Sequence, residues 1–187
     1  MLAHGAGAGM DVPALAAVTA GLAERGLRVA RFEFPYMLKR RETGRRRPPD
    51  RQPVLLETWR AVIEQLGPEG LFIGGKSMGG RMASLIADET GVAGLVCLGY
   101  PFHPPGRPEK TRTDHLAGLK TPTLILQGER DRLGTPEDVA GYTLSPAITV
   151  DWIPDGDHDL VPRKRSGRTA EENWLTAVAA IDEFVPD

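Results

Sequence analysis

The chain has 187 residues, a formal net charge of −2 and 41% hydrophobic residues. This length favours one domain, here residues 1–187, with a core large enough to need no disulfide or metal for stability. The near-neutral charge gives no overall reason to expect a nucleic acid as partner, and the absence of any long apolar run argues against a membrane span.

The single cysteine, Cys97, lies in the apolar run GLVCLG, which predicts a buried strand residue. Without a second cysteine no internal disulfide can form, which agrees with a cytoplasmic location. The first residues, MLAHGAGAG, lack the pattern of a signal peptide. Because the chain enters its first strand at once, we expect further sequence upstream of Met1, and a targeting segment there would change the predicted location.

The first part of the chain alternates strand-like and helix-like patterns. Residues 2–4 end a strand and lead into the small-residue loop GAGAG. Asp11 is the expected N-cap of a helix that ends at Gly26. Residues 27–34, LRVARFEF, predict a strand. The basic segment 39–51 is expected to be a solvated loop, and residues 53–66 carry a wide apolar helical stripe.

The second part continues the alternation and sets the fold class. Strands are predicted at 71–75, 93–100, 121–129 and 147–154, and helices at 81–90, 135–143 and 169–185. Thr135 should cap the second of these helices, and Thr169 with Glu172 forms a capping box on the third. Unbroken apolar strands separated by helices indicate an α/β fold: a mostly parallel sheet of about six strands with helices on both faces. Ligands bind such sheets beyond the carboxyl ends of the strands.

The stretch GLFIGGKSMGG fits two motifs with different chemistry. Counted from Gly70 it matches the phosphate-loop pattern G-x-x-x-x-G-K-[ST], and counted from Gly75 it matches G-x-S-x-G, the turn that presents a nucleophilic serine. A phosphate loop needs flexible backbone between its glycines, whereas Leu-Phe-Ile here are strand residues. The strand followed at once by a helix therefore favours Ser77 as a nucleophile, with the amide of Met78 beside it as an oxyanion donor.

A nucleophilic serine needs a base, and the base needs an acid that orients it. Asp131 follows the strand at 121–129, and His158 follows the strand at 147–154. The order serine, acid, histidine is the one expected for this strand-turn-helix arrangement. Since all three residues follow strands of one parallel sheet, we expect Ser77, Asp131 and His158 to meet at its carboxyl edge as a catalytic triad.

Three further residues are candidate substrate contacts. His103 lies just beyond the strand that ends near Tyr100. Arg45 and Arg46 belong to the basic segment 39–51, which should emerge at the catalytic edge and favour a substrate bearing a carboxylate or phosphate.

Several motifs resemble the α/β-hydrolase superfamily over nearly the whole chain: LAHGAGAG, GGKSMGG, LILQGERD and DGDHDL. The resemblance implies a second oxyanion donor at the amide of Ala6, and a minimal fold that lacks the first strands and a lid domain. The combination with LGYPFHPPGRPEKTR is similar to a compact branch of hydrolases, loosely akin to dienelactone hydrolases, that includes a testis-expressed protein and the hydrolase-like domain of a chromatin-complex subunit.

These features predict a serine hydrolase that acts on a small acyl substrate through an acyl-enzyme intermediate. A carboxylic ester is the first expectation, with a thioester or a small amide as alternatives, and neither a cofactor nor a metal is implied. The competing hypothesis is a catalytically silent interaction module that uses segment 39–51 to bind an acidic partner. The acyl group, the leaving group and the oligomeric state stay open.

Overall fold

The computed structural model describes residues 1–186, whose strands form one parallel six-stranded sheet in the order β2-β1-β3-β4-β5-β6. This arrangement confirms the predicted fold class. The strands are β1 (Leu2–Ala3), β2 (Arg31–Phe32), β3 (Phe72–Lys76), β4 (Gly94–Leu98), β5 (Thr123–Gly128) and β6 (Ile148–Ile153). The α-helices are α1 (Pro13–Glu24), α2 (Pro35–Thr43), α3 (Gln52–Leu66), α4 (Met78–Ser84), α5 (Ala87–Thr90), α6 (Pro136–Ala140) and α7 (Ala170–Phe184), with 3-10 turns η1 (Asp114–Gly118) and η2 (Lys164–Ser166).

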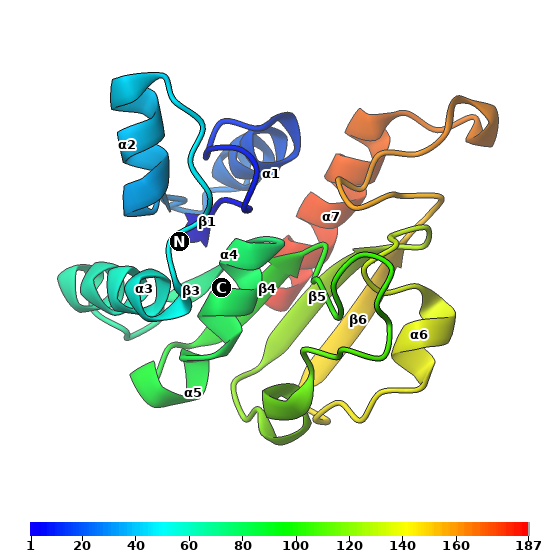
Figure 1. Cartoon of the computed structure of the whole chain (residues 1–187). Coiled ribbons are helices and arrows are strands. Elements are labelled where there is room, and N and C mark those ends of the chain that lie inside the picture. Colours follow the sequence, from blue (N-terminus) through cyan, green and yellow to red (C-terminus); the bar gives the residue numbers. More distant parts are fainter. Residues whose placement is uncertain (187) are drawn as a thin grey trace.

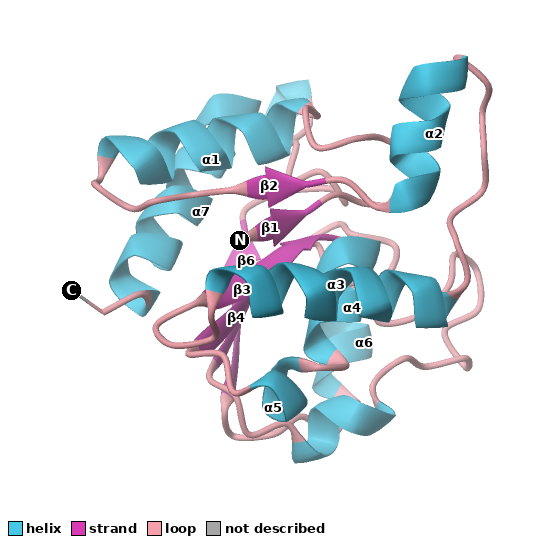
Figure 2. Cartoon of the chain, turned by 90° about the vertical axis from the view of Figure 1, so that its left-hand side faces the viewer, coloured by secondary structure: helices cyan, strands magenta, loops and turns pink. Residues whose placement is uncertain are grey.

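Helices cover both faces of the sheet (Figures 1 and 2). On one face α1 packs against α7, and Leu15 and Val178 are buried against those residues of β4 and β5 that point to this face. On the other face α3 and α4 pack together, and Trp59 and Met82 are buried against the remaining strand residues. The central strands β4 and β5 are buried on both faces, which is why their sequences read as continuous apolar runs.

Helix caps agree with the sequence at two helices and differ at a third. The hydroxyls of Thr135 and Thr169 each accept the amide three residues later, which confirms the caps expected for α6 and α7. The prediction that Asp11 caps α1 is wrong, because Val12 occupies the N-cap and makes no side-chain bond there. The Asp11 carboxylate instead pairs with Arg41 at 3.0 Å.

Two predictions for residues 27–51 need correction. The strand expected over 27–34 is only Arg31–Phe32, because its one neighbour, β1, is itself two residues long and offers no further backbone partners. Segment 39–51 is not a loop throughout, since its first five residues belong to α2, which starts at Pro35 and ends before Gly44 in a left-handed conformation. Arg41 of α2 is fixed by a double hydrogen bond to Glu33 at 2.6 Å.

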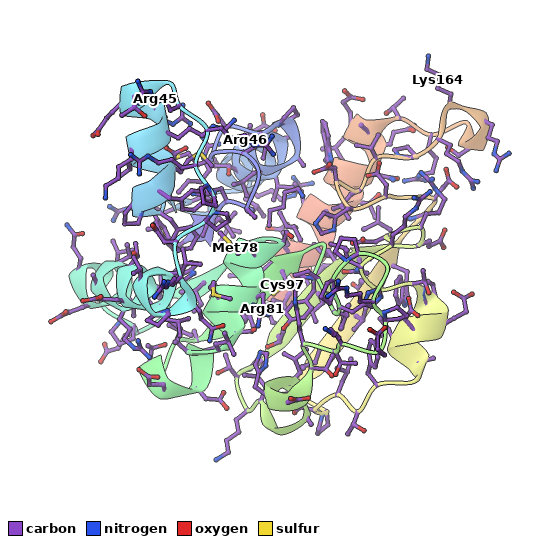
Figure 3. All side chains as sticks on the ribbon, viewed as in Figure 1. Arg45, Arg46, Met78, Arg81, Cys97 and Lys164 are labelled. Atoms are coloured by element: carbon purple, nitrogen blue, oxygen red, sulfur yellow. The ribbon has the colours of Figure 1, made fainter. Side chains whose placement is uncertain are left out.

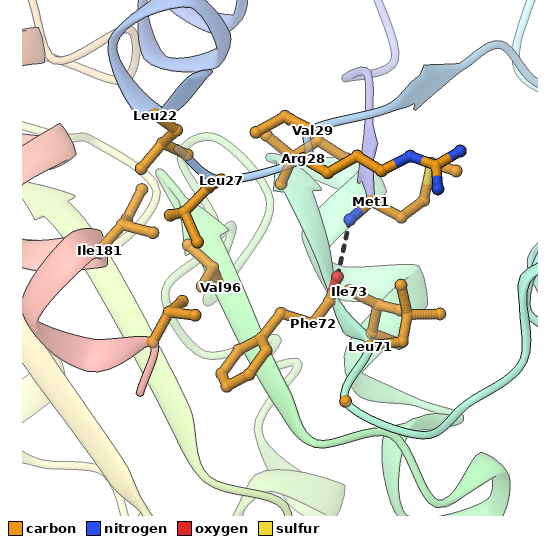
Figure 4. A pocket seen from close by; sticks show the side chains of 13 residues that line it. Met1, Leu22, Leu27, Arg28, Val29, Leu71, Phe72, Ile73, Val96 and Ile181 are labelled. Carbon is orange, nitrogen blue, oxygen red and sulfur yellow. Dashed lines mark hydrogen bonds between the residues drawn. The ribbon is translucent and has the colours of Figure 1, made fainter. Parts of the chain in front are cut away.

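An apolar cavity of about 270 Å³ opens at the amino ends of β1 and β3 (Figure 4). The Met1 amine donates to the Phe72 carbonyl there at 2.7 Å, and burial lowers the pKa of this amine to about 6. The lining contains no serine, histidine or carboxylate, so this cavity offers no chemistry of its own. Among the described helices, none is long and apolar enough to cross a membrane.

Candidate active site

Ser77 stands alone between a strand and a helix. β3 ends at Lys76 and α4 begins at Met78, which leaves Ser77 with φ 50° and ψ −115°. A non-glycine residue in this region is strained, and such strain persists where the surrounding structure enforces it. The phosphate-loop pattern has no structural counterpart here, because residues 72–76 are strand and the Lys76 ammonium is paired with Asp159 at 2.8 Å.

Close backbone contacts explain the glycines on both sides of Ser77. Gly75 has φ 149°, and a Cβ built there would collide with the backbone of Ala3 in β1. A Cβ on Gly79 would lie 2.6 Å from the Ala3 carbonyl and 2.7 Å from that of His4. Side chains at 75 and 79 would therefore push β1 away from the turn. The collisions at both glycines involve β1 and the residue that follows it.

The three predicted triad residues meet in one hydrogen-bonded chain. Ser77 Oγ lies 2.9 Å from His158 Nε2, and His158 Nδ1 lies 2.7 Å from Asp131 Oδ2. Asp131 is fully buried after β5, and His158 is partly exposed after β6. Because the carboxylate can only accept from Nδ1–H, Nε2 is left free to accept the serine proton.

The sequence matches the family described as alpha/beta hydrolase domain over residues 1–186. The chain belongs to the alpha/beta hydrolase family.

Solved alpha/beta hydrolases share the fold at low sequence identity. An alpha-beta serine hydrolase homologue from Coxiella burnetii is 17% identical with a TM-score of 0.70, over 95% of this chain and 78% of that one. An a/b serine hydrolase without lid from Xanthomonas campestris is 20% identical with a TM-score of 0.70, over 95% and 76% of the two chains. A monoacylglycerol lipase from Paleococcus ferrophilus is 15% identical with a TM-score of 0.71, over 98% and 93%. The narrower resemblance to the testis-expressed and chromatin-complex branch stays a prediction.

A buried glutamine orients the acid of this alpha/beta hydrolase. Gln127 donates from Nε2 to Asp131 Oδ2 at 2.9 Å and accepts the Tyr100 amide at 2.7 Å, and its side chain is fully buried. The Leu133 amide donates to Asp131 Oδ1 at 2.9 Å. Both carboxylate oxygens are thus hydrogen-bonded, which fixes the plane of the carboxylate and, through it, the imidazole of His158.

The loop after β1 lies beside Ser77, and two buried side chains form hydrogen bonds to its backbone. The Tyr36 hydroxyl lies 3.0 Å from the Ala6 carbonyl, and His4 Nδ1 lies 2.7 Å from the Gly5 carbonyl. The carbonyl oxygens of Gly5 and Ala6 therefore already have hydrogen-bond partners within the protein. No hydrogen bond within residues 1–186 engages the amide of Ala6 or of Met78.

Two cavities flank Ser77, with volumes of about 310 and 340 Å³, and Ala6 lines both of them. The larger is bounded by the small-residue loop 5–8, Val12 and the Lys76–Asp159 pair. The smaller runs between α3, α4 and the loop after β4, and it contains Arg81 and Arg112. The segment between β4 and β5 carries the turn η1 and no other helix or strand, so within residues 1–186 no lid domain lies over either opening.

The predicted substrate contacts are placed less favourably than the triad. His103 is buried, with Nδ1 2.9 Å from the Pro104 carbonyl and Nε2 3.4 Å from Asp138, and it lines neither cavity beside Ser77. Arg46 borders a shallow groove of about 540 Å³ that adjoins Ala6. Arg45 is exposed beyond the end of α2 and lines none of these hollows (Figure 3).

Several residues that shape the site escaped the sequence reasoning: Tyr36, Lys76, Arg81, Arg112, Gln127 and Asp159. Some carried a local signal, since Lys76 and Arg81 lie within the motif GGKSMGGRM and Asp159 follows His158. Tyr36, Arg112 and Gln127 had none, because they reach the site through long-range packing.

Proposed function

We propose that this chain is a serine hydrolase that cleaves small carboxylic esters through a Ser77–His158–Asp131 triad. The observation that carries the proposal is the unbroken pair of hydrogen bonds, 2.9 and 2.7 Å, that links the strained serine to a buried carboxylate. This is the arrangement that activates a serine hydroxyl for attack on an acyl carbon.

The proposed reaction has two halves. His158 Nε2 takes the proton from Ser77 Oγ as that oxygen bonds to the ester carbonyl carbon, and the imidazolium is stabilised by Asp131. The same proton then passes to the leaving alkoxide, which departs as the alcohol and leaves an acyl-serine. A water deprotonated by His158 attacks the acyl-serine, and the carboxylic acid is released as Ser77 regains its proton.

The amides of Ala6 and Met78 are the proposed oxyanion donors. Both are free of internal hydrogen bonds within residues 1–186, and both belong to segments that border Ser77. Removing one such donor typically lowers kcat by ~10²–10³-fold. Cavities of about 310 and 340 Å³ fit modest acyl and alcohol groups. The structural neighbours, among them a serine hydrolase and a monoacylglycerol lipase, support hydrolysis of acyl bonds as the proposed activity.

The test is covalent labelling by a fluorophosphonate probe, followed by hydrolysis of p-nitrophenyl esters of increasing chain length. The wild type should be labelled and should prefer short esters, whereas Ser77→Ala should lose both labelling and hydrolysis. Ser166→Ala, which changes an exposed serine in η2, is the matched control and should retain both. Full esterase activity in Ser77→Ala would refute the assignment.

The same experiment separates this proposal from a catalytically silent interaction module that binds an acidic partner through segment 39–51. Such a module has no use for an activated serine and would leave the probe unreacted.

A further inference from the structure

Two arginines line the 310 Å³ cavity that opens onto Ser77. Arg81 belongs to α4, and its amide donates to the Ser77 carbonyl at 3.0 Å, so the two residues lie one helical turn apart on the same side of the helix. Figure 3 shows Arg81 near Met78 in the same part of the molecule. Arg112 reaches the cavity from the loop between β4 and β5.

Arg81 carries a buried donor without an acceptor. Its Nε is inaccessible to solvent and has no hydrogen-bond partner among residues 1–186. Buried guanidinium donors are normally satisfied, so this unpartnered Nε shows that the charge of Arg81 is not compensated at that atom within the described residues.

Hydrogen bonds hold the backbone of Arg112 in place, while its guanidinium forms no ion pair among the described residues. Its amide donates to the Phe102 carbonyl at 2.7 Å, and its carbonyl accepts the Tyr100 hydroxyl at 3.0 Å. Burial lowers the pKa of Arg112, and the positive charge of Arg81 lowers that pKa further.

No carboxylate of the described chain neutralises this pair. The ion pairs within residues 1–186 involve other basic side chains and include neither Arg81 nor Arg112. The Asp50 carboxylate also lines the cavity; its Oδ2 accepts the Tyr36 amide at 2.9 Å, and among the described residues it forms no ion pair with either arginine. His115 of η1 places its Nε2 2.8 Å from Ser84 Oγ, and burial followed by the charge of Arg81 lowers the pKa of His115.

We propose that Arg81 and Arg112 form a carboxylate subsite, so that the esters cleaved at Ser77 carry a second, free carboxylate. This inference rests on the proposed function and names its substrate class: half-esters of dicarboxylic acids, or esters whose alcohol part bears a carboxylate. Two guanidiniums offer the paired N–H donors that a planar carboxylate accepts. The cavity is shared with Ser77, so one small molecule can reach both groups.

The first arm compares matched charged and neutral esters: monoethyl adipate against ethyl hexanoate, and 4-acetoxybenzoate against phenyl acetate. In the wild type, kcat/KM should be higher for the charged member of at least one pair. Arg112→Gln and Arg81→Gln should each lower the charged-to-neutral ratio of that pair by about 10- to 100-fold, mainly through KM, as expected for a lost charge-assisted hydrogen bond. Arg107→Gln removes an exposed charge from the same loop and should leave the ratio unchanged.

The second arm does not need turnover. Monoethyl adipate should raise the Tm of Ser77→Ala, and this rise should vanish when Arg112→Gln is added, with circular dichroism confirming that both proteins are folded. A charged-to-neutral ratio that is the same in the wild type and both arginine variants, together with an equal Tm rise in the two Ser77→Ala proteins, would overturn the subsite. If no ester is cleaved but the arginine-dependent Tm rise is present, the proposed function fails and the subsite stands.

Discussion

Replacing Gln127 by glutamate tests whether a hydrogen-bond donor is required behind the triad acid. The Gln127→Glu change keeps the shape of the side chain and the acceptor that receives the Tyr100 amide at 2.7 Å. It replaces the Nε2 donor, 2.9 Å from Asp131 Oδ2, with a second carboxylate oxygen. Both positions are fully buried, so water cannot screen the resulting contact.

The size of the effect follows from the separation of the two charges. Two carboxylates with charge centres roughly 4 Å apart repel by about 4 kcal/mol at an effective dielectric constant of about 20. That repulsion corresponds to about three pKa units, so the introduced carboxyl should have a folded-state pKa near ~7 instead of its unfolded value of about 4.3. Between these two values the unfolded chain gives up the proton and the folded chain keeps it. The free energy of unfolding of the variant should therefore fall as pH rises from about 4.5 to 7, by up to about 4 kcal/mol.

Urea-induced unfolding at pH 5 and pH 7.5 measures this change against the wild type. Gln127→Met removes the same hydrogen bonds without adding a charge, so its loss of stability should be equal at both pH values. Gln65→Glu makes the same chemical change on an exposed part of α3 and should shift stability by less than about 0.5 kcal/mol. A stability loss for Gln127→Glu that does not grow with pH would show that a charge at position 127 does not interact with the Asp131 carboxylate.

Two further predictions concern the loop after β1. Tyr36→Phe removes the hydroxyl that lies 3.0 Å from the Ala6 carbonyl. As a result, kcat for ester hydrolysis should fall by about 10-fold with little change in KM. A drop in KM with kcat unchanged would contradict a role of Tyr36 in positioning the oxyanion donor. His4 is fully buried, and burial lowers its pKa below the usual 6.5. The imidazole therefore binds a proton more readily in the unfolded chain than in the folded one. The free energy of unfolding should therefore decline as pH falls below about 6.5. Urea titration should show a weaker dependence of this free energy on pH in His4→Asn than in the wild type. An identical pH dependence in the two proteins would exclude His4 as its source.

The proposed triad could be predicted from the sequence because each member carries a local signal. Ser77 lies in a short motif whose glycines the structure requires, and Asp131 and His158 each follow a recognisable strand. In a parallel sheet all three positions lie at one edge, so the order of strands and helices was enough to bring them together before any distance was known.

The supporting residues could not be predicted because they depend on contacts distant in sequence. Gln127 reads as one more residue of an apolar strand, and only the folded structure shows that its side chain reaches Tyr100 and Asp131. Helix α2 was a different kind of miss, since Pro35 and Gly44 are typical helix boundaries that the charge of segment 39–51 obscured. The length of β2 depended on β1, which no pattern within residues 27–34 could reveal.

The strand register has a consequence for how chains of this fold can vary in length. Lys76 pairs with Leu98, and Leu126 pairs with Leu98 from the other side, so the residues that precede the nucleophile and the acid are aligned through β4. One residue inserted into β3 would advance Ser77 by about 3.3 Å and turn its side chain to the opposite face, and an insertion into β5 or β6 would displace the loop that carries Asp131 or His158. Insertions and deletions are therefore compatible with the chemistry in the connections at the amino ends of these strands, where they leave the alignment intact.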